Sequence, residues 1–289
     1  MKHFYLITAY TDPEHLGKLV RSLQSENSFF YIHLDKKSKL RSHPAVLALS
    51  KIPQVNFIQR PVSVSWGGFS HLKAILLLMR QAAANQQSGY MHLLSGQCFP
   101  IKKVNEIEKF FAQNAGKEFM ACYSLETMNW TGGSANRLQL YHLNDWFNIR
   151  ARFWKRINSR FLQLQRKLGV KRKLPGFKEY YGGGTWWSIT TKAAGIILNA
   201  FQLDPALPKK LSYTHCSEEI IPQTILMNSE VRSNIIPDDL RYVDWNTRDG
   251  HCPLVLDERD FANIAVSNKL FARKMASGVS DKLREKLSA

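Results

Sequence analysis

The sequence has few of the features that mark secreted, metal-binding or membrane-spanning proteins. Its four cysteines are widely scattered and form no Cys-x-x-Cys pair, which disfavours a zinc site or a disulfide framework and favours a reducing cytoplasm. No run approaches the roughly 20 apolar residues that a membrane span needs. Residues 1–10 are too few and too aromatic for a signal peptide and instead predict a first β-strand. No internal repeat, low-complexity segment or clear linker divides the 289 residues.

Acidic residues are scarce: 23 Asp and Glu stand against 40 Lys and Arg, which gives a net charge of +17. Such an excess suggests a polyanionic partner, namely nucleic acid, an anionic membrane face or a phosphorylated substrate. The shortage is most marked in residues 146–178, which hold no acid and eleven Lys or Arg. Apolar side chains recur there at helical spacing, at Phe147, Phe153, Trp154, Ile157, Phe161, Leu164 and Leu168. Two interpretations stay open: a basic amphipathic helix that lies on an anionic bilayer, or a solvated helix whose apolar stripe packs on the domain.

Strand-like and helix-like segments alternate through the first half of the chain. The β-prone runs are 4–9, 29–34, 55–58, 90–94 and 118–122, and the helical patterns are 12–23, 69–84 and 104–115. This order predicts an α/β fold with a mostly parallel sheet between layers of helices, in which ligands bind beyond the carboxyl ends of the strands. Asp35, Ser95 and Ser124 follow strand ends, so we expect them where a nucleotide or a sugar would lie.

A pair of acids in the last third could supply general-base chemistry. Glu218 and Glu219 follow Ser217, a good helix N-cap, and precede Pro222, so a helix should begin near them. Taken alone, the acids would merely complement the helix dipole. The segment 182–187 favours a catalytic role for these acids, because its three glycines permit close backbone approach and two tryptophans follow them. Aromatic faces beside a carboxylate are typical of carbohydrate sites, and a core strand would explain one tryptophan but not both.

Six motifs, in order along nearly the whole chain, resemble the core-2/I-branching β-1,6-N-acetylglucosaminyltransferase and peptide xylosyltransferase family. They are Tyr31-Ile32-His33-Leu34-Asp35, Trp66-Gly67-Gly68-Phe69-Ser70, residues 93–101, Gly184-Thr185-Trp186-Trp187, Ser217-Glu218-Glu219 and Leu270-Phe271-Ala272-Arg273-Lys274. The resemblance implies a GT-A-type, Rossmann-like fold, here a single catalytic domain over residues 1–289. Within it we expect a nucleotide-sugar-binding half (1–125), a basic amphipathic insertion (146–178) and an acceptor and catalytic half (179–289).

The resemblance also implies an inverting transfer of a sugar from a UDP-sugar to an acceptor hydroxyl, without a metal or another cofactor. The absence of an Asp-x-Asp motif agrees with this, because that motif usually binds the divalent ion that holds the nucleotide diphosphate. Lys or Arg can neutralise the leaving group instead. UDP-GlcNAc is the favoured donor and UDP-xylose is the alternative.

Site residues follow from the resemblance, position by position. Glu219 matches the catalytic base, and donor contacts are implied for Ala9, Asp35, Ser95, Arg273 and Lys274. The family's second diphosphate-binding cation falls near His251, so His251, Arg248 or Arg273 could fill that role. Acceptor contacts are implied for Glu126, Trp186, Trp187, Glu218 and Trp245. Trp66 and Ser70 fit a structural role as well as an acceptor role.

The family's Golgi members have an N-terminal anchor and a cysteine-rich character that this chain lacks, so we expect a compact bacterial relative in the cytoplasm. Its acceptor would be a lipid-linked or surface glycan, such as a lipopolysaccharide core or a capsule precursor. Residues 146–178 would then dock on the inner face of the cytoplasmic membrane. A non-enzymatic nucleic-acid-binding protein is the rival interpretation; it explains the charge but not the Ser217-Glu218-Glu219 segment. A degenerate sugar-binding partner is a third, and the presence of both Glu219 and Lys274 argues against it.

Overall fold

A computed structural model describes residues 1–128, 130 and 133–288, and its centre is a seven-stranded sheet. The strands, in spatial order, are β10 (Ile235–Ile236), β6 (Glu118–Met120), β9 (Trp187–Thr190), β4 (Gly89–Ser95), β1 (Lys2–Ala9), β2 (Ser28–Leu34) and β3 (Val55–Phe57). β1 to β4 are parallel, and β9 runs antiparallel between β4 and β6. Buried strands in such a sheet are apolar almost throughout, which is how β1 and β2 read in the sequence. The expected mostly parallel α/β architecture is confirmed.

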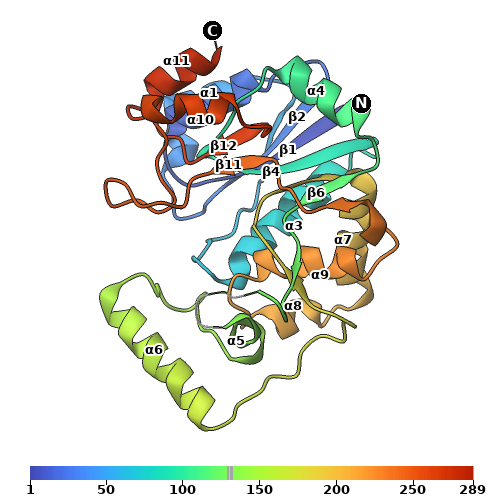
Figure 1. The fold of residues 1–289 in the computed structure, drawn as a ribbon, viewed down its shortest axis with the longest axis vertical. Coiled ribbons are helices and arrows are strands. Elements are labelled where there is room, and N and C mark those ends of the chain that lie inside the picture. Colours follow the sequence, from blue (N-terminus) through green and yellow to red (C-terminus); the bar gives the residue numbers. More distant parts are fainter. Residues whose placement is uncertain (129, 131–132, 289) are drawn as a thin grey trace.

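Helices cover both faces of the sheet (Figure 1), and each face has its own hydrophobic cluster between the sheet and its helices. One face carries α1 (Pro13–Ser22), α2 (Pro44–Leu49), α4 (Val104–Gln113), α10 (Phe261–Ala265) and α11 (Asp281–Ser288). The other carries α3 (Phe69–Ala83), α7 (Thr191–Leu203), α8 (Leu207–Leu211) and α9 (Ile221–Met227). The carboxyl ends of β1, β2 and β4 are therefore left open between two helical layers.

The first 125 residues fold as the hydrophobic periodicity predicts. All eight expected elements are present, and their ends differ from the predicted ones by no more than two residues. The expected helix start near the acids is also present, as a 3-10 turn, η2 (Ser217–Glu219), followed by α9 with Pro222 in its first turn. Ser217, however, does not cap: Cys216 precedes the turn, and the buried Ser217 Oγ has no hydrogen-bond partner among the described residues.

A second, three-stranded sheet lies beside the carboxyl ends of the strands of the first sheet. It consists of β11 (Arg241–Val243), β12 (Phe271–Arg273) and β5 (Cys98–Pro100), with Arg273 paired to Cys98 in the antiparallel ladder of β12 and β5. A buried guanidinium joins the two sheets, because Arg241 donates to the carbonyls of Leu93 (3.0 Å) and Trp187 (2.7 Å). Burial lowers the pKa of Arg241 to about 10. The end of β12 is thereby fixed beside the carboxyl ends of β4 and β9.

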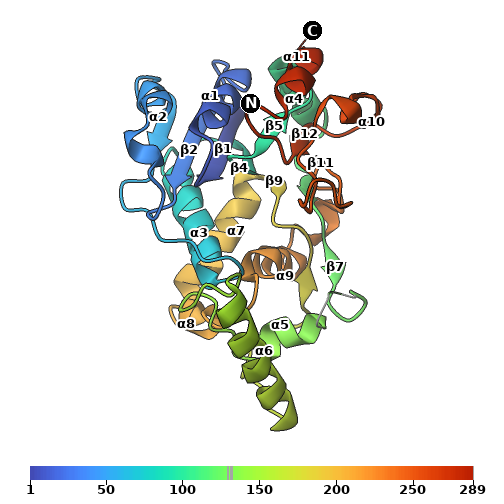
Figure 2. The same ribbon diagram turned by 90° about the vertical axis from the view of Figure 1, so that its left-hand side faces the viewer.

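The remaining elements are short, apart from one helix. They are η1 (Leu40–Ser42), β7 (Tyr123–Ser124), α5 (Ser134–Gln139), β8 (Tyr181–Gly182), η3 (Arg232–Asn234) and η4 (Glu258–Asp260), and β7 pairs with β8. The exception is α6 (Arg152–Lys167), which lies apart from the three layers, as both views show (Figures 1 and 2). Within the described part of the chain, no helix is both long and apolar enough to cross a membrane.

The basic segment forms the expected helix, and its apolar stripe is only partly covered: Phe147, Trp154 and Phe161 are half-buried. Phe153 is 65% exposed and Leu168 is 70% exposed, and Ile157 and Leu164 are also exposed. Two kinds of contact hold α6. The Trp154 ring stacks on Phe147, with 4.2 Å between ring centroids, and the Gln165 side-chain amide forms hydrogen bonds with the backbone of Tyr141. These exposures favour the surface-lying helix of the two interpretations left open by the sequence, and both stay predictions.

The glycine run before β9 is required by close backbone contacts. A Cβ on Gly183 would lie 1.8 Å from the carbonyl oxygen of Ala121, and one on Gly182 would lie 2.5 Å from the Trp130 ring. A side chain at either position must displace its neighbours. The expectation that these glycines permit close approach is confirmed.

We expect Gly183→Ala to destabilise the fold by about 3 kcal/mol or more, because the obstructing atom belongs to the backbone directly after β6, which cannot easily move aside. The matched control is Gly195→Ala in α7, where nothing lies within 4 Å of the new Cβ. That variant should gain about 0.5–1 kcal/mol from helix propensity. Chemical denaturation of both variants and the parent measures the difference, and equal stabilities for the three would contradict the analysis.

Candidate active site

The carboxyl ends of β1, β2 and β4 bring together three residues expected to contact the donor. The carbonyl of Ala9 accepts the N–H of Asp35 at 2.9 Å, and Gly96, next to Ser95, packs against the Ala9 side chain. The Asp35 carboxylate accepts the backbone N–H groups of Lys37 (2.8 Å) and Val64 (3.1 Å). Asp35, a buried residue, therefore fixes the loop that leads to α3. Its contact with a nucleoside stays a prediction.

Ser95 and Trp186 both orient Arg273. The Arg273 guanidinium donates to Ser95 Oγ, which also accepts the N–H of Gln97 at 3.2 Å. The Arg273 Cζ atom lies 4.4 Å from the centroid of the Trp186 ring. A cation held over an aromatic face and by a hydroxyl has a restricted set of rotamers. The structure thus groups Trp186, expected on the acceptor side, with a residue expected on the donor side.

Lys274 follows Arg273 directly and is partly buried. Its backbone is fixed by Leu254 and Leu256, whereas its ammonium has no hydrogen-bond or ion-pair partner among the described residues. Burial lowers the pKa of Lys274, and the positive charges of Arg273 and Arg150 lower it further. Removing these neighbouring positive charges, or binding an anion beside them, would raise the pKa of Lys274 again.

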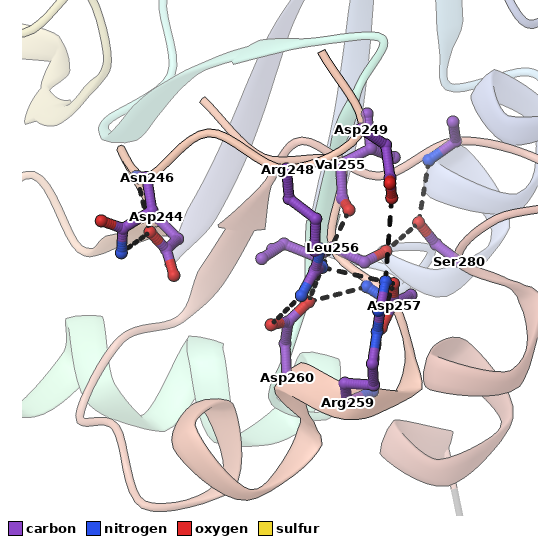
Figure 3. A network of polar contacts seen from close by, with 11 residues as sticks. Asp244, Asn246, Arg248, Asp249, Val255, Leu256, Asp257, Arg259, Asp260 and Ser280 are labelled. Carbon is purple, nitrogen blue, oxygen red and sulfur yellow. Dashed lines mark hydrogen bonds and ion pairs between the residues drawn. The ribbon is translucent and has the colours of Figure 1, made fainter. Parts of the chain in front are cut away.

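Arg248 is not free to bind a phosphate, because two aspartates neutralise it. Its guanidinium forms a two-pronged ion pair with Asp260, at 3.1 and 2.5 Å, and lies 3.3 Å from Asp257 (Figure 3). These hydrogen bonds raise the pKa of Arg248. His251 is exposed and pairs with Arg248 only through the backbone. Among the three cations that could supply the second diphosphate contact, Arg248 is therefore assigned a structural role.

A backbone hydrogen bond attaches the segment that carries the expected base to the loop before α3. Cys216 adopts a left-handed conformation (φ 50°) and donates its N–H to the carbonyl of Gly67 at 2.9 Å. On the other side, the carbonyl of Glu219 accepts the N–H of Gly183, also at 2.9 Å. Backbone bonds on both sides of η2 set the direction in which Glu219 leaves the chain.

Arg137 pairs with the carboxylate of Glu219. The Arg137 Nη1 atom lies 2.7 Å from Glu219 Oε2, and the Thr185 hydroxyl lies 3.4 Å from Oε1. Arg137 also stacks on Trp130, with Cζ 3.8 Å from the ring centroid. The Glu219 side chain is 27% exposed, and burial raises its pKa, as does the charge of Glu218, while Arg137 opposes both effects. A partly exposed carboxylate whose pKa is raised by burial and by a neighbouring acid is well suited to accept a proton.

Glu218 faces the interior of the protein. The residue is 4% exposed, its Oε1 lies 3.0 Å from His71 Nδ1 on α3, and its Oε2 has no partner among the described residues. Its effect on the site is through its charge, which acts on Glu219. The expected direct contact between Glu218 and an acceptor is therefore corrected to a supporting role.

The other expected acceptor residues are spread out. Trp187 is fully buried in one of the two hydrophobic clusters, so it has no surface with which to contact a sugar and is assigned to the core. Trp245 is 72% exposed in the loop after β11, and Glu126 is exposed in the turn after β7. No described contact joins either side chain to Glu219, and their roles stay predictions.

Trp66 and Ser70, just before and at the start of α3, make different contacts. The Ser70 N–H and hydroxyl both donate to the Asp145 carboxylate, which is a structural anchor. The exposed Trp66 ring meets His215 edge-on at 5.5 Å and carries the Arg150 guanidinium 5.8 Å from its centroid. Sequence reasoning missed Arg137, Trp130 and Arg150, because no local pattern distinguishes them from neighbouring polar or basic residues.

Comparison with known proteins identifies the family. A sequence profile of the Core-2/I-Branching enzyme family matches residues 4–268, so the chain belongs to this family of glycosyltransferases, and its three-layer fold is of the GT-A type. The xylosyltransferase oxt of Drosophila melanogaster is 23% identical over 81% of this chain and 25% of its own length. Xylosyltransferase 2 of Canis lupus familiaris is 23% identical over 93% of this chain and 31% of its own length.

The chain thus spans about a quarter to a third of the length of the curated relatives that it matches. Among solved structures, a protein from Bacillus anthracis assigned as a glucose-1-phosphate thymidylyltransferase aligns over 73% of this chain and 80% of its own. The identity is 13% and the TM-score is 0.33, a likeness too weak to carry an argument.

We expect Arg137→Leu to move the acid limb of the kcat/KM profile upward by about one pH unit or more. The raised pKa of Glu219 means that the ionised base is lost as the pH falls through that value, and Arg137 is the nearby cation that opposes the rise. A pH series of the parent, Arg137→Leu and the remote control Arg156→Leu measures this limb. Coincident acid limbs in the parent and Arg137→Leu would contradict the assignment.

Proposed function

We propose that the protein catalyses an inverting, metal-independent transfer of a sugar from a UDP-sugar to a glycan hydroxyl, with Glu219 as the general base. The observation that carries the proposal is the separation of charge in the site. A carboxylate with a raised pKa lies next to Trp130 and Arg137, while Arg273 and Lys274 gather at the end of β12 without an acidic partner among the described residues. One side suits an acceptor hydroxyl and the other suits a diphosphate.

The chemistry proceeds by a single displacement. Glu219 takes the proton of the acceptor hydroxyl as that oxygen forms a bond to the anomeric carbon of the donor sugar. The bond from that carbon to the UDP oxygen breaks on the opposite face, and its electron pair goes to the diphosphate. Arg273 and Lys274 would neutralise the charge that develops there, in the place of a divalent ion. General-base assistance of this kind typically contributes about 10²–10⁴-fold.

Two donors are consistent with the family. UDP-GlcNAc fits the branching enzymes, whereas UDP-xylose is favoured by the names of the relatives, which are xylosyltransferases. A donor pocket distinguishes the two through a few contacts worth about 1–3 kcal/mol. The acceptor, under this proposal, is a lipid-linked or surface glycan of a bacterium, such as a lipopolysaccharide core or a capsule precursor.

The decisive measurement is UDP release by the purified protein with UDP-GlcNAc, UDP-xylose and other UDP-sugars, in EDTA and with a panel of glycan acceptors. We expect turnover with one donor in EDTA, and its loss in Glu219→Gln, because an amide cannot accept the proton. UDP binding by Glu219→Gln should remain near the parent value, since Glu219 lies on the acceptor side. Activity that requires a divalent ion would overturn the account of the leaving group, and a fully active Glu219→Gln would remove Glu219 as the base.

The proposal places the enzyme at the inner face of the cytoplasmic membrane, docked through residues 146–178. Phe153, Ile157, Leu164 and Leu168 recur along α6 at helical spacing and are all exposed. Arg156, Arg160 and Lys167 flank them on one side and have no ion-pair partner among the described residues. Exposed apolar groups bordered by cations match the surface of an anionic bilayer, which offers hydrocarbon beneath phosphate.

The triple variant Arg156→Gln, Arg160→Gln and Lys167→Gln should bind phosphatidylglycerol-containing vesicles roughly 100-fold more weakly than the parent, at about 1 kcal/mol for each cation. The control with the same charge change is Lys51→Gln, Lys73→Gln and Lys109→Gln, all exposed on the body of the protein. Sedimentation with the vesicles measures both. Equal binding by the two triple variants, or none by the parent, would refute the docking surface.

A further inference from the structure

The last helix of the described chain, α11, is joined to the core through a buried arginine and a buried histidine. Arg284 is 5% exposed, and its Nη1 atom lies 2.8 Å from Nδ1 of the fully buried His15 on α1. The other ring nitrogen of His15, Nε2, lies 3.0 Å from the carbonyl oxygen of Cys98 in β5. A single imidazole therefore connects three elements that are far apart in the sequence, namely α1, β5 and α11.

The two partners of His15 decide where its proton lies. A guanidinium only donates hydrogen bonds, so Nδ1 accepts from Arg284, and a carbonyl only accepts them, so Nε2 carries the hydrogen. A second proton on the ring would place an N–H group against the guanidinium. Burial, together with the charge of Arg284, accordingly lowers the pKa of His15 to about 4. His15 is thus neutral at neutral pH and donates to Cys98.

The connection continues from Cys98 to Arg273. The two residues are paired in the antiparallel ladder of β5 and β12. The Cys98 Sγ atom lies 3.3 Å from the backbone nitrogen of Ser95 and 3.4 Å from its Oγ, the atom that accepts from the Arg273 guanidinium. Both the strand pairing and the hydroxyl that hold Arg273 therefore involve Cys98.

A second contact ties the segment after β12 to the start of α1. Asp12 caps α1 by accepting the N–H of His15 at 3.0 Å, and it also accepts the N–H and the hydroxyl of Ser277, each at 2.7 Å. Ser277 comes three residues after Lys274 in the chain. The segment of Arg273 and Lys274 is therefore held from the same turn of α1 on both sides, through His15 and through Asp12.

We infer that His15 is a positioning residue for the donor site, because its hydrogen bond to Cys98 keeps β5, and with it Arg273, in place, while Arg284 of α11 holds the imidazole ring. The inference rests on the proposed function. His15 is fully buried and acts only through Cys98. A guanidinium stabilises a departing diphosphate best when its N–H groups already point at the place where the charge develops. A misplacement of about 1 Å at such a group can cost roughly 100-fold in rate.

The test compares two replacements of His15 in the full chain. The amide nitrogen of glutamine reaches about as far as Nε2 of histidine, so His15→Gln retains a donor for Cys98. Asparagine is shorter and matches Nδ1, so His15→Asn can accept from Arg284 but does not reach Cys98. Calorimetric titration should show UDP binding weakened about 10-fold or more in His15→Asn and near the parent value in His15→Gln. Uridine binding should be unchanged in both, because only UDP carries the diphosphate.

His3→Asn is the matched control. His3 is also fully buried, with Nδ1 3.0 Å from His92 Nε2, but it lies at the start of β1, at the opposite end of that strand from the donor residues. Its replacement should destabilise the fold in chemical denaturation, as His15→Asn does, and leave UDP binding unchanged. Equal losses of UDP binding in His3→Asn and His15→Asn would refute the inference. So would equal losses in His15→Gln and His15→Asn, or equal losses for UDP and uridine.

Lys274→Ala separates failure of this inference from failure of the proposed function. Weaker UDP binding in Lys274→Ala together with parent-like binding in His15→Asn would overturn the role of His15 and leave the donor site in place. No UDP binding by the parent, or no effect of either substitution, would overturn the donor site itself.

Discussion

The position of the candidate base depends on two backbone hydrogen bonds, one on each side of the short turn that carries it. Cys216 donates to Gly67 at the start of α3, and Glu219 accepts from Gly183 in the run before β9. Both partners are glycines whose surroundings leave no room for a side chain, because a Cβ on Gly67 would lie 2.6 Å from His215 and one on Gly183 would meet Ala121. The two backbone hydrogen bonds therefore fix the position of the turn, and Arg137 adds an ion pair to the Glu219 carboxylate.

Charge is distributed unevenly around this fixed turn, and under the proposed function this distribution separates two chemical tasks. A general base must be ionised but not so well solvated that it resists the proton, and partial burial opposed by Arg137 gives Glu219 this state. A leaving diphosphate needs positive charge that is not already used by the protein. The aspartates that could have provided counterions near β12, Asp257 and Asp260, are occupied by Arg248. That internal pairing leaves Lys274 and its neighbours unneutralised.

The sequence predicted the fold better than it predicted the site, for physical reasons. Long periodic segments such as α3, or continuous apolar strands such as β1, depend on local pattern, and they lie where expected. The two adjacent tryptophans show the limit. Alternation along a strand predicts that they face opposite ways, but only the pairing of Trp187 with Leu93 decides which one enters the core. The roles of Arg137 and Glu218 depend on contacts with distant parts of the chain, which a single sequence does not encode locally.

On the exposed face of α6, a well-formed amphipathic pattern has no core to pack against. Elsewhere in the fold, apolar side chains at regular spacing are buried, whereas here they are exposed to water. Such exposed apolar patches mark functional surfaces. Nucleic acid would be bound through phosphates and by stacking on aromatic rings, so the exposed aliphatic residues Ile157, Leu164 and Leu168 would gain nothing from it. A bilayer offers hydrocarbon to those residues and phosphate to the arginines beside them. The exposed apolar side of this basic segment therefore supports the proposal of a lipid surface over that of nucleic acid.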